Sequence, residues 1–248
     1  MSSRGLAVAW HTAAGASLGR LAATAGPAGL ILGRDHAGEF VPIRLLRPEP
    51  THAVLVGGAW AARLLAFRCL GVGARVDVVS GGWSNWTGFG ERAGAPGQLT
   101  LTSVSPGFEA GRLGDRRPPT SPEFVVSGGP DDSAGSMRPV LHIYDVGPGG
   151  PVERPALAPW HTQLVVLPHL TIHGAPVVAE ADIVLLQRID AEEAALCESL
   201  LRLPPDTSDR LQQMHDDMLA VLAPGADNYV WFAPTPVEYE LLGAPHRN

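Results

Sequence analysis

The sequence predicts an α/β protein whose mostly parallel sheet is flanked by helices and preceded by an N-terminal β-hairpin. Short apolar segments of strand length alternate with segments of helical periodicity, an order that is typical of parallel sheets covered by helices. The clearest unit lies between 51 and 80, where an apolar strand, a glycine turn, a helix and a second strand follow one another. At 248 residues, the chain is long enough to bury one sizeable core.

The predicted hairpin opens the folded part of the chain. Residues 29–33 and 39–46 are short extended runs, separated by a turn that contains Asp, His and Gly. We expect a single α/β domain over 29–248, preceded by a segment at 1–28 that can form a helix. Within this domain, 105–138 is rich in Pro, Gly, Ser and Arg, which indicates a loop insert.

The βαβ unit that follows the hairpin has clear boundaries. Residues 54–56 are wholly apolar, as expected for a strand that is buried on both faces of a parallel sheet. Residues 59–70 have helical periodicity and are followed by glycine, and 75–79 form the next strand.

The rest of the chain continues the alternation of strands and helices. Further strands are predicted at 98–104, 140–144, 163–167, 183–187 and 229–232. Further helices are predicted at 83–93, 191–203, 209–222 and 236–242. The helix at 191–203 has Asp190 as its cap and Glu193 at the capping-box position.

Composition excludes several classes of function. All 18 basic residues are arginine, so reactions that need a lysine amine are excluded. The net charge is −7 without any basic cluster, which disfavours nucleic-acid binding. No apolar run approaches the roughly 20 residues of a membrane-spanning helix. Cys69 and Cys197 are expected to be buried free thiols, and such thiols fit a cytoplasmic location.

The glycine turn has the spacing of a phosphate-binding loop but not its chemistry. Residues 57–64 match the length of G-x-x-x-x-G-K-[ST], yet Ala62, Arg63 and Leu64 occupy the last three positions. Arg63 keeps a positive charge that can hold an anion. Leu64 replaces the hydroxyl that would bind Mg²⁺. We therefore expect that ATP hydrolysis has been lost.

The order of the hairpin, the glycine turn and an apolar strand that ends at Asp145 resembles a nucleotide-binding lobe of the FtsK/SpoIIIE-type ATPases. This family includes the multi-lobed ATPases of type VII (ESX) secretion, and the likeness spans roughly 29–235. The resemblance puts the P-loop glycine at Gly57 and the acidic residue of the second motif at Asp145, whereas the catalytic glutamate falls on Val146. It implies a degenerate P-loop NTPase-like lobe without catalysis, which acts as an accessory or scaffold for a protein partner in a larger assembly.

The candidate site lies where open α/β folds bind ligands, at the carboxyl ends of the strands. The candidate ligand-binding residues are Gly57, Gly58, Trp60, Arg63 and Asp145. Trp83 and Trp86 are candidates for contact with a protein partner, because tryptophan is favoured at interface hot spots. We predict no catalytic residue, no cofactor and no metal ion.

A dinucleotide- or S-adenosylmethionine-binding enzyme is the alternative. Gly57, Ala59 and Ala62 approximate G-x-G-x-x-G with two glycines replaced. Asp77 follows Gly57 at about 20 residues, the spacing of a ribose-binding acid.

Three histidines raise a metal hypothesis. His161, His169 and His173 lie close in sequence, and the last two have the i, i+4 spacing of two ligands on one helix. However, Pro168 and Gly174 indicate a loop. We expect these histidines to be structural or exposed.

Overall fold

The computed structural model describes residues 29–82, 85–94, 97–103, 138–151, 156–223 and 226–247. The described strands form one ten-stranded sheet in the order β2-β1-β10-β9-β8-β3-β7-β6-β4-β5. The strands are β1 (Leu30–Arg34), β2 (Phe40–Ile43), β3 (Thr51–Val56), β4 (Arg75–Ser80), β5 (Leu99–Ser103), β6 (Val140–Asp145), β7 (His161–Leu167), β8 (Ile183–Leu186), β9 (Met218–Ala223) and β10 (Ala226–Phe232). The helices are α2 (Ala59–Gly71), α3 (Phe89–Arg92), α4 (Ala175–Ala179), α5 (Ala191–Leu201), α6 (Pro205–Gln213) and α7 (Pro236–Leu242).

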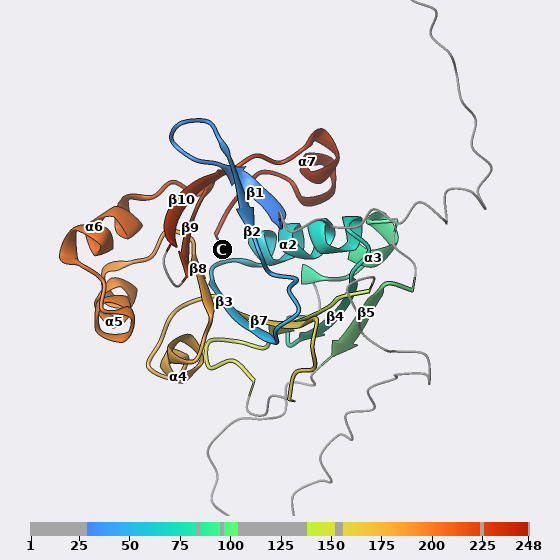
Figure 1. Ribbon diagram of the computed structural model, residues 1–248, viewed down its shortest axis with the longest axis horizontal. Helices are drawn as coiled ribbons and strands as arrows, with labels where there is room; N and C mark the ends of the chain where they lie inside the picture. The colour runs from blue at the N-terminus through green and yellow to red at the C-terminus, as the bar shows by residue number, and fades with distance from the viewer. Residues whose placement is uncertain are drawn as a thin grey trace, which may run out of the picture.

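The sheet is parallel from β8 to β5 and antiparallel from β8 to β2 (Figure 1). The hairpin of β1 and β2 joins the antiparallel part by pairing with β10. The predicted α/β class, with a mostly parallel sheet, flanking helices and an N-terminal hairpin, is confirmed.

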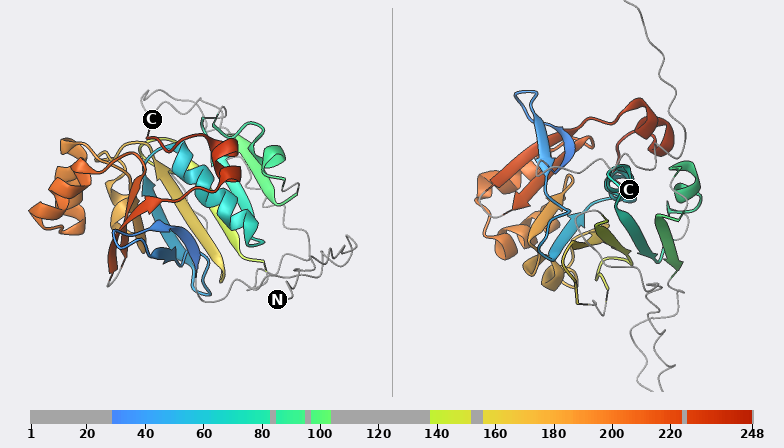
Figure 2. Two further views of the ribbon diagram at one scale, coloured as in Figure 1. Left: turned by 90° about the horizontal axis from the view of Figure 1, so that it is seen from above. Right: turned by 45° about the vertical axis from the view of Figure 1, so that its right-hand side comes forward.

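The sheet has an apolar core on each face. Successive side chains of β3 alternate between them, as they must in a strand. Ala53 and Leu55 belong to the core that includes α2, and Val54 and Val56 to the core that includes α5. Figure 2 shows α2 lying along one face of the parallel strands. Because β3 is covered on both faces, it is apolar throughout its second half, as predicted.

Several local predictions are confirmed. The unit of β3, α2 and β4 has the predicted order and boundaries within two to three residues at the ends. Asp190 caps α5 and forms a capping box with Glu193. The prediction of buried cysteines is also confirmed, because Cys69 and Cys197 are both free and buried.

The predicted helix at 209–222 is wrong. α6 ends at Gln213, and the chain turns extended at Met214, whose ψ is 148°. The apolar run of β9 then pairs with β8 and β10. A short apolar run fits either a strand or a buried helix, and here the two neighbouring strands decide it. His215 therefore lies outside a helix, directly before the turn at 216–217.

Other helices differ in extent. α3 is a single turn within the predicted helix at 83–93, and α4 was not predicted. The possible helix at 1–28 lies outside the described residues, as does the insert at 105–138 except for its last residue. Among the helices that the structure describes, none is long and apolar enough to cross a membrane.

One buried arginine ties three elements together. Arg68 of α2 donates from Nε and Nη2 to the carboxylate of Glu238 in α7, at 2.6 and 3.0 Å. Its Nη1 donates to the carbonyl oxygens of Ile31 and Leu32 in β1, each at 2.6 Å. Burial alone would raise the pKa of Glu238, but the hydrogen bonds and charge of Arg68 and the bonds from Thr235 lower it overall.

We predict that protonation of Glu238 destabilises the protein in acid. The folded-state pKa lies below the ordinary value of 4.5, so the stabilisation is complete above that value and is lost as the pH falls through the folded-state pKa. Urea denaturation from about pH 6 to about pH 3 should show a steeper loss of stability for the wild type than for Glu238→Gln. Parallel curves for the two proteins would contradict this assignment.

Candidate functional site

The turn between β3 and α2 is too short to wrap around a phosphate. Only Gly57 and Gly58 separate the two elements, because α2 begins at Ala59. A P-loop uses the amide groups of a longer glycine-rich loop to cradle phosphates. In this chain, the corresponding residues 59–62 are already helical. Their amide groups therefore belong to the first turn of α2 and not to a cradle.

A glutamine side chain fills the space in front of this turn. The N–H of Gly58 donates to Oε1 of Gln187 at 2.7 Å, and Gln187 is fully buried. A Cβ atom at Gly57 would lie 2.5 Å from the same oxygen, so any larger residue there would displace the amide group of Gln187. Donors at a helix N-terminus are natural partners for anions. Here the donor at Gly58 is used by Gln187.

The end of the chain lies over Gln187 and α2. We call residues 243–247 the C-terminal tail. Nε1 of Trp60 donates to the carbonyl oxygen of Gly243 at 3.0 Å, and Nε2 of Gln187 donates to that of His246 at 3.4 Å. The tail therefore covers Gln187, which already fills the space in front of the turn between β3 and α2.

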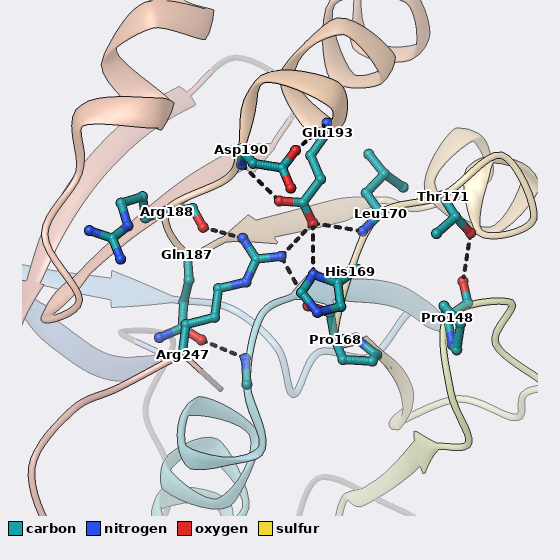
Figure 3. A network of polar contacts seen from close by, with 11 residues as sticks. Pro148, Pro168, His169, Leu170, Thr171, Gln187, Arg188, Asp190, Glu193 and Arg247 are labelled. Carbon is teal, nitrogen blue, oxygen red and sulfur yellow. Dashed lines mark hydrogen bonds and ion pairs between the residues drawn. The ribbon is translucent and has the colours of Figure 1, made fainter.

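Arg247 anchors the tail through its guanidinium group (Figure 3). It donates to the carboxylate of Glu193 and to the carbonyl oxygen of Arg188, and also to that of Pro168 at 2.9 Å. The side chains of Arg247 and Glu193 are 10% and 4% exposed. The pair is thus almost fully removed from water, where an unpaired charge is costly.

Glu193 has a double role that sequence reasoning found only in part. Its Oε2 accepts the N–H of Asp190, which is the predicted capping box. Its Oε1 accepts the N–H of Leu170 at 2.8 Å as well as the bond from Arg247. No local pattern marked Arg247 or Gln187, because each acts on a residue far away in the sequence.

The carboxylate of Asp145 accepts hydrogen bonds from side chains inside the protein. It ends β6, and its Oδ2 accepts from Nε1 of Trp86 at 2.9 Å and from Oγ of Ser80 at 3.3 Å. Trp86 is fully buried and packs edge-on against Phe89. Its position in the core leaves Trp86 no surface for a partner in this conformation. Trp83 lies outside the described residues.

Trp60 and Leu64 of α2 lie in the core, whereas Arg63 lies at its edge. Leu64 and Trp60 are fully buried, and the Trp60 ring packs at 5.1 Å from that of Phe232. Arg63 is half-buried, and its Nε donates to the carbonyl oxygen of Ala59 at 3.4 Å. Burial, followed by the charge of Arg92, lowers the pKa of Arg63, while Asp145 opposes this change.

The strand order disagrees with the dinucleotide-binding alternative. In a Rossmann fold, the strand after the first helix lies beside the first strand. Here β7 and β6 separate β3 from β4. Asp77, the candidate ribose-binding acid, forms an ion pair with Arg75 at 3.0 Å within β4 and lies 3.4 Å from Nδ1 of His142.

The three histidines of the metal hypothesis do not lie together. His161 begins β7 and contacts His142 at 3.0 Å, whereas His169 and His173 follow the end of that strand. His169 is exposed and lies 3.8 Å from Glu193. In the part of the chain that the structure describes, no group of three or more His, Cys, Asp or Glu residues could hold a metal ion.

Several solved structures have a similar fold. VirB4 of Thermoanaerobacter pseudethanolicus aligns with a TM-score of 0.56 and 8% identity, over 86% of this chain and 98% of that chain. The pCW3 conjugation coupling protein TcpA, in its monomer form with ATPγS, aligns with a TM-score of 0.51 and 8% identity, over 84% of this chain and 67% of that chain. These likenesses show the fold, and the predicted P-loop NTPase-like fold is confirmed.

A further match is to the cytoplasmic domain of the Thermomonospora curvata type VII secretion ATPase EccC. Its TM-score is 0.47 at 11% identity, over 88% of this chain and 32% of that chain. No protein-family model matches the sequence, and no curated protein matches it.

Proposed function

We propose that this chain is a non-catalytic, P-loop-like lobe that serves as an accessory or scaffold protein in a larger assembly. The observation that carries the proposal is the start of α2 at Ala59, directly after Gly57 and Gly58. The segment that would enclose a triphosphate is helical, and the space before it holds Gln187. A nucleotide would need both the loop and the space.

The chemistry of hydrolysis is also missing from this site. Leu64 is buried in the core, so no hydroxyl is available at this position for Mg²⁺. Val146 follows Asp145 where a base that orients water would be needed. Asp145 itself already accepts two hydrogen bonds from side chains. The arrangement supports a structural use of the fold.

The wider setting follows from the resemblance in the sequence. A lobe without activity can serve as a docking or regulatory part of a larger machine, so we expect a protein partner, and no nucleic acid because the net charge is −7. We place the protein in the cytoplasm, with a link to type VII secretion. TcpA, one of the structural neighbours, is a conjugation coupling protein.

Nucleotide titration tests this function. We predict that neither ATP nor ADP with Mg²⁺ raises the melting temperature of the protein. A ligand at 100 times its dissociation constant would add about 2.7 kcal/mol, which would raise the melting temperature by roughly 5–10 °C. Arg247→Ala is the matched variant, because it frees the tail without restoring the missing loop, and it should also show no shift. ATP turnover that disappears in Arg63→Ala would overturn the proposal.

A further inference from the structure

A groove lies between the hairpin turn, α6 and β10, away from the turn at Gly57 and Gly58. Its volume is about 620 Å³. Figure 1 shows α6 and the hairpin turn on either side of β10. The lining residues are Asp35, His36, Thr207, Arg210, Gln213, Met214, Met218, Asp227, Asn228, Tyr229 and Trp231.

The groove combines apolar side chains with an unused polar atom. Met214 and Met218 are buried, and Trp231 and Tyr229 are partly buried in the same core. The hydroxyl oxygen of Tyr229 is buried and has no hydrogen-bond partner among the described residues. Buried polar groups normally have one. The hydroxyl is therefore an unsatisfied polar group on a residue that lines the groove.

Negative charge exceeds positive charge around the groove. Asp35 and Asp227 form no ion pair among the described residues, whereas Arg210 is paired with Asp206 at 2.6 Å. Burial raises the pKa of Tyr229, and the carboxylates of Asp227 and Asp206 act in the same direction against Arg210. The phenol therefore keeps its proton at neutral pH. The groove presents net negative charge beside aromatic rings.

We propose that this groove binds an arginine side chain presented by a segment of a partner protein. A guanidinium plane can stack on an aromatic face and direct its forked donors to a carboxylate at the same time. Trp231 and Tyr229 supply the faces, and Asp227 supplies the carboxylate. Asp35 adds negative charge at the rim, although its Oδ1 already accepts the N–H groups of Ala37 and Glu39 at 2.9 Å each. The groove shares no residue with the turn before α2, so this proposal does not depend on the loss of nucleotide binding.

Peptide titration followed by NMR tests the proposal on the full chain. The probe is the capped pentapeptide Ala-Leu-Arg-Leu-Ala, and its control carries citrulline, which has the same shape without the charge. We expect the arginine peptide to shift the signals of Tyr229 and Trp231, and the citrulline peptide to have little effect. Equal binding of both peptides, equal binding of a lysine peptide, or no binding of the arginine peptide would overturn the proposal.

Substitutions at three exposed residues test whether the peptide binds in the groove. Asp227→Asn should weaken the peptide at least about 10-fold, because it removes a charge-assisted hydrogen bond. Arg210→Gln should strengthen it several-fold, because it removes a positive charge from the lining of the groove. Asp209→Asn is the matched control, since Asp209 is exposed on α6 but does not line the groove. A loss in Asp209→Asn equal to that in Asp227→Asn would mean general charge attraction and would overturn the proposal.

Discussion

Replacing Arg68 with alanine is expected to lower the free energy of unfolding by about 4 kcal/mol, since breaking a buried ion pair from one side costs about 3–5 kcal/mol. The side chains of Arg68 and Glu238 are 13% and 4% exposed. The substitution leaves the Glu238 carboxylate without its cation and removes donors from three carbonyl oxygens, including that of Ala233. Urea denaturation would measure the loss.

Two comparisons show whether the loss of stability is specific to Arg68. Arg210→Ala removes an arginine of an ion pair whose side chains are 63% and 64% exposed, and should cost no more than about 0.5 kcal/mol. The double variant Arg68→Ala with Glu238→Gln should lose less than the sum of its single variants, because the two residues share their bonds. Equal losses in Arg68→Ala and Arg210→Ala would contradict the role assigned to burial.

Replacing Arg247 with alanine is expected to lower the free energy of unfolding by about 2–3 kcal/mol, which is at or just below the lower limit of the range of about 3–5 kcal/mol for buried pairs. Glu193 keeps the N–H donors of Leu170 and Asp190 in this variant. These two hydrogen bonds reduce the cost below that expected for Arg68.

The reactivity of Cys197 provides a local measurement of the same change. Burial, reinforced by Glu193 and opposed by Arg247, raises the pKa of this thiol to about 12. Loss of Arg247 also removes the charge that lowers this pKa, so labelling of Cys197 by a thiol reagent becomes faster than in the wild type only if the tail moves aside and exposes the thiol, which is the result we expect. His246→Ala is the control, because the carbonyl of His246 and not its ring accepts the bond from Gln187. Unchanged labelling and stability in Arg247→Ala would show that the tail is not anchored as described.

Local patterns in the sequence were sufficient for much of the fold. The apolar strand before Gly57, the helix after it and the strand that ends at Asp145 are each encoded by neighbouring residues, and all three were predicted. The capping box of Asp190 and Glu193 was predicted for the same reason, because its partners are three residues apart. The run of β9 could not be assigned in this way, because strand and buried helix share its composition.

The candidate site was only partly predictable, because its contacts join distant residues. Gly58 and Gln187 are 129 positions apart, and Glu193 and Arg247 are 54 apart. The burial of Trp86, a candidate for contact with a partner, could not be predicted for the same reason. Its indole donates to Asp145, which is 59 positions away in the sequence.

By itself, the sequence determined the α/β class, the glycine turn and the loss of the lysine and hydroxyl that a P-loop requires, because these depend on residue identity and short-range spacing. The sequence also placed the start of α2 at Ala59, but only the tertiary structure decided that Gln187 fills the space before it and that the C-terminal tail lies over both. The physical reason is that packing brings donors and acceptors together across the sheet, and a buried donor must find an acceptor wherever the fold supplies one.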